Sequence, residues 1–203
     1  MKRGRPRSFD TEVVLDNALK VFWRHGFQNT NLSTLTTATG LSKPSLYAAF
    51  GNKKSLYLIV LERYITLLGE MHVGILTNEP NGREAIAAFL HSLVNMFTDV
   101  RLPGGCFIIT GIADFGGALV PKEIEAALHL ALKNTETLLS ERLFQAQRDR
   151  QLPENTNLQN LCKLFCTLIA GLAIQAKSGA TEDTLNLVVT TMMEVWPSSF
   201  SQT

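Results

Sequence analysis

The sequence predicts an all-α protein: an N-terminal three-helix helix-turn-helix DNA-binding domain followed by a larger helical ligand-binding and dimerisation domain, about nine helices in all. Apolar residues recur at helical spacing through nearly the whole chain, and no stretch alternates as a strand would. Residues 1–54 hold nine Lys/Arg and three acidic residues, a net charge of +6, whereas the remainder carries −5. A basic head on an acidic body is typical of a DNA-binding module joined to a second function.

Length and composition narrow the class of protein. The 203 residues suffice for one large or two small domains, and 45% of them are hydrophobic. No uninterrupted apolar run reaches the roughly 20 residues that a membrane span needs. The basic N-terminus, MKRGRPRSFD, lacks the apolar stretch of a signal peptide. A cytoplasmic location is therefore predicted, with the three cysteines as thiols.

The first helix is predicted over about Thr11–His25, with Asp10 as its N-cap and Gly26 ending it. A short second helix follows over Leu32–Thr39, where a weaker apolar period is visible.

A tight turn then leads into the third helix. Gly40 supplies the left-handed residue, Ser42 caps the new helix, and Pro44 lies in its first turn, where a missing N–H has no cost. Leu46 and Phe50 are expected to point inward, which leaves the polar side chains of this helix facing outward.

The remaining helices are closed by Gly and Pro signals. They are expected over about Asn52–Thr77, Arg83–Val100, Phe107–Phe115, Pro121–Gln151, Leu158–Lys177 and Thr181–Trp196.

The third helix is predicted to read DNA. It runs from Ser42 for barely two turns, so that only its N-terminal residues can reach base edges in the major groove. Lys43 can donate to the acceptors of guanine, and Pro44 offers an apolar face to a thymine methyl. Ser45 can contact a base or a phosphate.

Further DNA contacts are predicted around this helix. Lys53, at the start of the connector helix, combines its charge with the helix dipole to bind a phosphate. Thr34 is expected to contact the backbone or an outer base. The arm with Arg3, Arg5 and Arg7 suits a narrow A/T-rich minor groove, or it only adds non-specific attraction.

These motifs resemble the tetracycline-repressor-like (TetR) family of bacterial transcription regulators over about residues 9–64. The shared order is a basic arm, a helix, Gly-Phe, a short helix, T-G-L-S-K-P-S-L-Y-x-x-F and then G-x-K-x-x-L. The residues that carry the resemblance are Phe9, Ala18, Phe22, Gly26, Phe27, Thr30, Leu35, Gly40, Leu41, Leu46, Tyr47, Phe50, Lys53 and Leu56. It implies that Tyr47 donates its hydroxyl to a phosphate and that the body binds an effector.

Specific binding requires two heads, because one short helix offers few base contacts. The last two long helices are the candidates for dimerisation, and the resemblance implies a four-helix bundle between subunits. Their apolar faces are also candidates for the core. The predicted interface residues are Phe165, Leu168, Leu172, Leu185, Val188, Met192 and Trp196.

An effector pocket is expected between the helices of the body, where any apolar residue is also a candidate for ordinary core packing. The predicted ligand contacts are Phe89, Leu93, Met96, Phe97, Cys106, Phe107, Thr110, Phe115 and Leu132.

The cysteines have two interpretations each. Cys106 opens a short helix after Pro-Gly-Gly, a position that tends to lower a thiol pKa, and the resemblance implies a response to electrophiles or oxidants. The alternative is a small buried hydrophobe. Cys162 and Cys166 have a spacing that can bind metal, but no other ligand lies near in sequence, so core packing is favoured. No metal or cofactor is predicted.

The sequence therefore predicts a cytoplasmic homodimeric repressor, not an enzyme, that binds a palindromic operator and leaves it on binding an unknown small molecule or electrophile. The domains are placed at residues 1–8 (basic arm), 9–54 (DNA binding) and 55–198 (effector binding and dimerisation). One alternative is an architectural DNA-binding protein without an effector. A second is a thiol enzyme with Cys106 as nucleophile and His129 as base, for which no orienting third group is recognisable.

Overall fold

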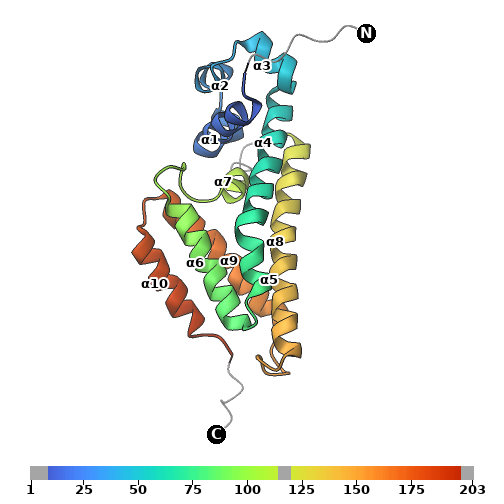
Figure 1. Ribbon diagram of the computed structural model, residues 1–203, viewed down its shortest axis with the longest axis vertical. Coiled ribbons are helices and arrows are strands. Elements are labelled where there is room, and N and C mark those ends of the chain that lie inside the picture. Colours follow the sequence, from blue (N-terminus) through green and yellow to red (C-terminus); the bar gives the residue numbers. More distant parts are fainter. Residues whose placement is uncertain (1–8, 114–119, 198–203) are drawn as a thin grey trace.

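Helices make up most of the computed structural model, which describes residues 9–113 and 120–197, and no strand occurs within those ranges. The all-α prediction is confirmed. The three N-terminal helices form a head at one end of an elongated molecule, and the longer helices form the body behind it (Figure 1). The arm arginines Arg3, Arg5 and Arg7, and the predicted ligand contact Phe115, lie outside the described residues.

The first helix, α1 (Thr11–Asn29), begins where its cap was predicted. The Asp10 carboxylate accepts a hydrogen bond from the Glu12 N–H at 2.9 Å. Gly26 interrupts the helical geometry with φ 74° and ψ 176°, so the chain kinks there and adds a last turn rather than ending.

The other two helices of the head are α2 (Leu32–Thr39) and α3 (Lys43–Phe50). Gly40 adopts the predicted left-handed conformation, with φ 69°. The Ser42 hydroxyl accepts from the Ser45 N–H at 3.3 Å and caps α3. The helix-turn-helix geometry therefore follows from residues that the sequence identifies.

The predicted connector is one continuous helical rod, made of α4 (Lys53–Leu68), a π-helical turn η1 (Gly69–Val73) and α5 (Gly74–Asn78). The rod leaves the head and runs along the body, with α4 packed against α8 (Figure 1). The π-helical turn was not predicted. Such turns insert an extra residue into the helical ladder and are frequent at functional sites.

The body contains α6 (Gly82–Thr98), α7 (Phe107–Ala113), α8 (Lys122–Arg148), α9 (Leu158–Lys177) and α10 (Glu182–Met193). Helix α9 packs against both α8 and α6, and α10 covers α6.

Helix α9 bears on the expectation that no part of the sequence is apolar over the length of a membrane span. Within the described residues it is the one helix that is long and apolar enough to cross a membrane by length and composition. A third of its most apolar window, 33%, is buried within the protein, and the core helices of soluble proteins pass the same test.

A cluster of five aromatic rings joins the head to the body, and we call it the aromatic joint. It contains Phe22 and Trp23 of α1, Tyr57 and Tyr64 of α4, and Phe107 of α7. The ring centroids are 5.1 Å apart for Phe22–Tyr57, 5.0 Å for Trp23–Tyr64 and 5.6 Å for Tyr64–Phe107. All five rings are buried. Edge-to-face packing of this kind adds to the stabilisation from burial.

A close approach between two backbones holds the loop before α7. Gly105 donates its N–H to the Phe97 carbonyl at 2.8 Å and has a left-handed φ of 67°. A Cβ at this position would lie 2.5 Å from the Ala173 carbonyl oxygen of α9, so only glycine fits.

Polar contacts also tie the head to the rest of the molecule. The ammonium of Lys177, at the end of α9, donates to the carbonyls of Trp23 and Pro103, each at 3.1 Å. Arg63 of α4 donates to the Asp16 carboxylate of α1 at 2.8 Å and also pairs with Glu12.

Candidate DNA-reading helix and effector cavity

Helix α3 is exposed along the side that was predicted to face DNA. Leu46 and Phe50 are buried, as predicted, and anchor the helix to the head. The predicted DNA contacts at its cap and on its surface are all exposed: Ser42, Lys43, Pro44, Ser45 and Tyr47. The Lys43 ammonium lies 5.9 Å from the centre of the Tyr47 ring. The exposed face therefore presents one cation and several hydroxyls within two helical turns, which suits phosphate and base-edge contacts.

Thr34 and Lys53 occupy more constrained positions. The Thr34 hydroxyl donates to the Asn31 carboxamide at 3.0 Å within the cap of α2, which leaves its lone pairs free to accept. The Lys53 ammonium lies 4.5 Å from the Phe27 ring centre and donates to the Gln28 carbonyl at 3.4 Å. Partial burial lowers the pKa of Lys53. A phosphate contact by Lys53 stays a prediction, and it requires the side chain to leave these partners.

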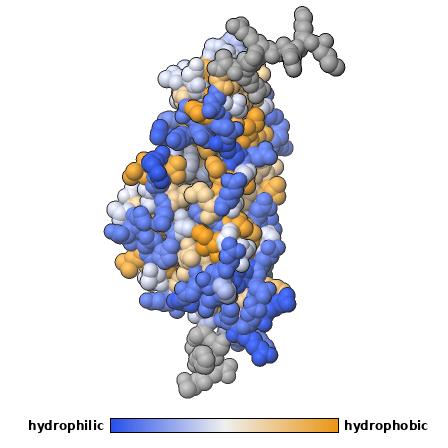
Figure 2. Space-filling view, in the orientation of Figure 1, coloured by the Kyte–Doolittle hydropathy of each residue, from blue (hydrophilic) through white to orange (hydrophobic). Residues whose placement is uncertain are grey.

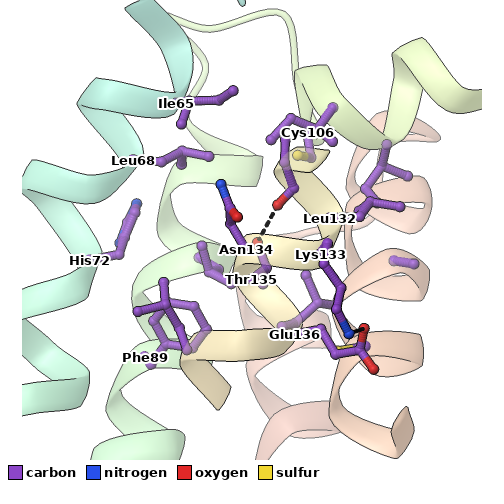
Figure 3. A pocket seen from close by; sticks show the side chains of 18 of the residues that line it. Ile65, Leu68, His72, Phe89, Cys106, Leu132, Lys133, Asn134, Thr135 and Glu136 are labelled. Carbon is purple, nitrogen blue, oxygen red and sulfur yellow. Dashed lines mark hydrogen bonds and ion pairs between the residues drawn. The ribbon is translucent and has the colours of Figure 1, made fainter. Parts of the chain in front are cut away.

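The body contains a cavity of about 860 Å³, open to solvent, between the connector rod, α6, α7, α8 and α9 (Figure 3). The predicted ligand contacts that lie on its wall are Phe89, Leu93, Phe97, Cys106 and Leu132. The exposed lysines Lys133 and Lys163 mark where α8 and α9 open the cavity to solvent.

Three other predicted contacts do not line the cavity: Met96, Phe107 and Thr110. Met96 is buried on α6 between Leu93 and Phe97, which do line the cavity. Phe107 belongs to the aromatic joint, and the Thr110 hydroxyl donates back to the Cys106 carbonyl at 2.8 Å. Helical periodicity does not distinguish these faces, because both are apolar.

The polar part of the cavity wall was largely missed. Lys133 forms an ion pair with Glu136 at 3.0 Å, and Asn134 and Thr135 lie between them on α8 (Figure 3). The sequence signal that could have identified these residues is that they form a polar run in the middle of a half-buried helix. His72 lies on the opposite wall, and because η1 reads as ordinary amphipathic helix, no local pattern identified it.

Cys106 lies on the cavity wall just before α7 as a buried thiol, which fits the interpretation as a small buried hydrophobe. Its thiol is 7% exposed and accepts a hydrogen bond from the Tyr64 hydroxyl at 3.4 Å. Burial raises the pKa of Cys106, which corrects the expectation that the helix terminus would lower it. Desolvation of the thiolate outweighs the helix dipole here.

The cysteines of α9 are placed as core residues at the edge of the cavity. Cys162 is buried, and Cys166 lines the cavity. Burial, followed by the neighbouring Cys162, raises the pKa of Cys166 to about 12. Across residues 9–113 and 120–197, no group of three His, Cys, Asp or Glu side chains is arranged to hold a metal ion.

The predicted interface residues divide between the core and the surface. Phe165, Leu172 and Leu185 are at most 1% exposed and belong to the core of a single chain, which corrects their assignment as contact residues. Four are partly exposed and stay predictions: Leu168, Val188, Met192 and Trp196. Hydrophilic residues cover most of the face shown in Figure 2, with apolar patches between them.

An exposed helix-turn-helix on a helical body with a large cavity defines a class, that of DNA-binding regulators of transcription. Residues 14–60 match the family model of bacterial regulatory proteins of the tetR family, and residues 82–192 match that of the tetracyclin repressor-like C-terminal domain. The chain therefore belongs to the TetR family of transcription regulators.

Two relatives are similar along nearly the whole chain. The HTH-type transcriptional repressor ComR of Escherichia coli (strain K12) is 33% identical over 198 residues, which cover 96% of this chain and 92% of ComR. The TetR family regulator CifR, solved as a cysteine mutant with a 26bp double-strand operator DNA, is 32% identical with a TM-score of 0.89, covering 95% of this chain and 100% of CifR. The fold is also that of AibR, solved with isovaleryl coenzyme A and operator DNA, at 17% identity and a TM-score of 0.72 over 92% of this chain and 98% of AibR.

Proposed function

We propose that this TetR-family repressor is a homodimer that binds a palindromic operator through α3 of each subunit and releases it when an effector fills the cavity. The observation that carries this proposal is the connector rod. Its α4 segment contributes Tyr57 to the aromatic joint, and the same rod lines the cavity with Ile65, Leu68 and His72. An effector that binds one arrangement of this rod more tightly than another shifts the position of the heads.

The relatives support both operator binding and effector binding. CifR carries operator DNA in its solved complex, and it matches this chain in sequence as well as in fold. AibR carries a small-molecule thioester and operator DNA on the same fold. A cavity of about 860 Å³ favours an effector-responsive regulator over an architectural protein without a ligand.

The surface of α9 and α10 supports dimerisation. Their exposed apolar side chains include Leu164 at 41%, Ile174 at 55% and Leu187 at 67%. No atom lies within 4 Å of a Cβ built on Gly171, so another backbone can approach this part of α9. A monomer in sedimentation equilibrium at micromolar concentration would contradict the dimer.

We infer that the protein acts as a regulator in the cytoplasm and not as a thiol enzyme. The thiol-enzyme alternative needs Cys106 as a thiolate and His129 as its base, but burial raises the Cys106 pKa and its hydroxyl partner is Tyr64. ComR and CifR, the relatives of this protein, are regulators of transcription, which act on DNA.

Replacing the exposed groups of α3 tests the DNA-reading assignment. Lys43→Ala and Tyr47→Phe are each expected to weaken operator binding, Lys43→Ala by about tenfold or more, because a good base or phosphate contact contributes about 1–3 kcal/mol. The measurement is a gel-shift titration with a duplex that the wild-type protein selects from random sequences. Circular dichroism should show unchanged helix content.

Lys122→Ala is the matched control, since it removes an exposed lysine from the body. Unchanged affinity for both α3 variants, or an equal loss for Lys122→Ala, would reject the assignment.

Removing the Cys106 thiol tests the response to electrophiles. Any release of the protein from DNA by N-ethylmaleimide is expected to be lost in Cys106→Ser. The thiolate sulfur bonds to one alkene carbon, and a proton from water adds to the other. Because burial raises the Cys106 pKa, the thiolate fraction and the rate of release should increase as pH rises above neutral.

Cys166→Ser is the control, since Cys166 lines the same cavity. Release of Cys106→Ser by the reagent would show that another group senses it.

A further inference from the structure

We propose that the effector is a largely apolar molecule that carries a hydroxyl or N–H group, and that this group donates a hydrogen bond to Nε2 of His72. The inference deepens the proposed function and rests on it, since it takes the cavity as the effector site. It assigns a polar contact on the connector rod itself.

The hydrogen bonds around His72 favour one tautomer of its ring. The Ser92 hydroxyl has one hydrogen, which it donates to the Phe89 carbonyl at 2.7 Å. The same hydroxyl oxygen lies 2.9 Å from Nδ1 of His72 and can only accept there. With the Ser92 hydrogen on the Phe89 carbonyl, Nδ1 carries the ring proton, and Nε2 of the neutral ring is left as a bare acceptor.

Burial keeps the ring neutral. His72 is 4% exposed and packs edge-to-face on Phe89, with 6.4 Å between ring centroids. This burial lowers the pKa of His72, because an imidazolium is poorly solvated there. A neutral ring with a protonated Nδ1 offers Nε2 only to a donor.

Nε2 finds no hydrogen-bond partner among residues 9–113 and 120–197, and less than 1 Å² of it is accessible. A buried acceptor without a donor is unfavourable, and a ligand that supplies the donor recovers that loss. His72 lies on the cavity wall between Leu68 and Phe89 (Figure 3). A ligand that carries only acceptors would leave Nε2 unpaired.

The position of His72 couples this contact to the connector rod. Because Nε2 is covered, a donor reaches it only when the ring or its neighbours shift. His72 lies in the π-helical turn η1, where the helical ladder of the rod is already interrupted. A ligand that engages Nε2 therefore acts on the rod at its π-helical turn.

The experiment compares three neutral probes of similar shape on the full-length protein by isothermal titration calorimetry: 2-naphthol, 2-methoxynaphthalene and naphthalene. Only 2-naphthol has a donor. We expect the wild-type protein to bind it about tenfold more tightly than 2-methoxynaphthalene, as satisfying one buried acceptor predicts. In His72→Phe the ratio should fall to about one, with the affinity for naphthalene retained.

Two further variants separate this role from a general change in the cavity. His129→Phe removes the other imidazole on the cavity wall and should keep the tenfold ratio. Ser92→Ala removes the acceptor that holds the proton on Nδ1, so the ring can present an Nε2–H and the preference should narrow.

A measurement on the wild-type protein does not depend on any variant folding. Long-range ¹H–¹⁵N spectra should show Nε2 of His72 as an unprotonated, pyridine-type nitrogen that shifts on addition of 2-naphthol only. Equal affinities of the wild-type protein for 2-naphthol and 2-methoxynaphthalene, a preference retained in His72→Phe, or a protonated Nε2 would each overturn the proposal. Failure of all three probes to bind would instead count against the cavity as an effector site, and so against the proposed function.

Discussion

Phe107→Ala is expected to lower the free energy of unfolding by about 3–5 kcal/mol, the range for truncating a fully buried phenylalanine. The Phe107 ring has no exposed surface and contacts Trp23, Tyr57 and Tyr64 at once. Its loss opens a cavity where three elements meet, and none of the rigid helical backbones can close it. Urea denaturation followed by circular dichroism, at one fixed protein concentration, measures the effect.

Phe144→Ala is the matched control. Phe144 is 56% exposed on α8, so its truncation should change the free energy of unfolding of a single chain by less than about 1 kcal/mol. A loss for Phe107→Ala no larger than the loss for Phe144→Ala would mean that the aromatic joint does not hold the two parts together.

Gly105→Ala should be destabilising by roughly 2–5 kcal/mol, the sum of a left-handed backbone penalty and overpacking. Gly105 has φ 67°, and a Cβ there would lie 2.5 Å from the Ala173 carbonyl oxygen. The contact is with backbone, so no side chain can rotate away. The loop must move, and with it the hydrogen bond from the Gly105 N–H to Phe97.

The neighbouring glycine provides the comparison. Gly104 also has a left-handed φ, of 80°, but the nearest atom to its Cβ position is 3.8 Å away. Gly104→Ala should therefore show only the backbone penalty, about 1–2 kcal/mol. Melting temperatures of the two variants at equal concentration give the difference, and equal melting temperatures would reject the close approach as the cause.

The head was predictable because its signals are local. Asp10, Gly40 and Ser42 act at caps and turns through hydrogen bonds within a few residues, and a single sequence contains all of that information. Helix α9 was predicted with its observed bounds, Leu158–Lys177, for the same reason: an apolar period with a polar residue before it and Gly179 after it.

The cavity and the dimer surface were only partly predictable, because they depend on which apolar face meets which neighbour. Phe165 and Leu172 read as interface residues, but the other helices of the same chain cover them. Burial raises the pKa of Cys106, and the Tyr64 hydroxyl that donates a hydrogen bond to its thiol lies 42 residues away in the chain. His72 became visible only when the π-helical turn brought it beside Ser92 of α6.

The contact made by Lys177 has a consequence for how separable the two parts of this protein are. The Lys177 ammonium, in the last turn of α9, donates a hydrogen bond to the Trp23 carbonyl of α1, which lies 154 positions earlier in the chain. A fragment cut after the connector would leave that carbonyl without its ammonium, and Trp23 and Tyr57 without the Phe107 ring that packs against both. The head is therefore not an independent unit. A chimera that joins it to the body of another regulator must also contain residues that replace Phe107 and Lys177.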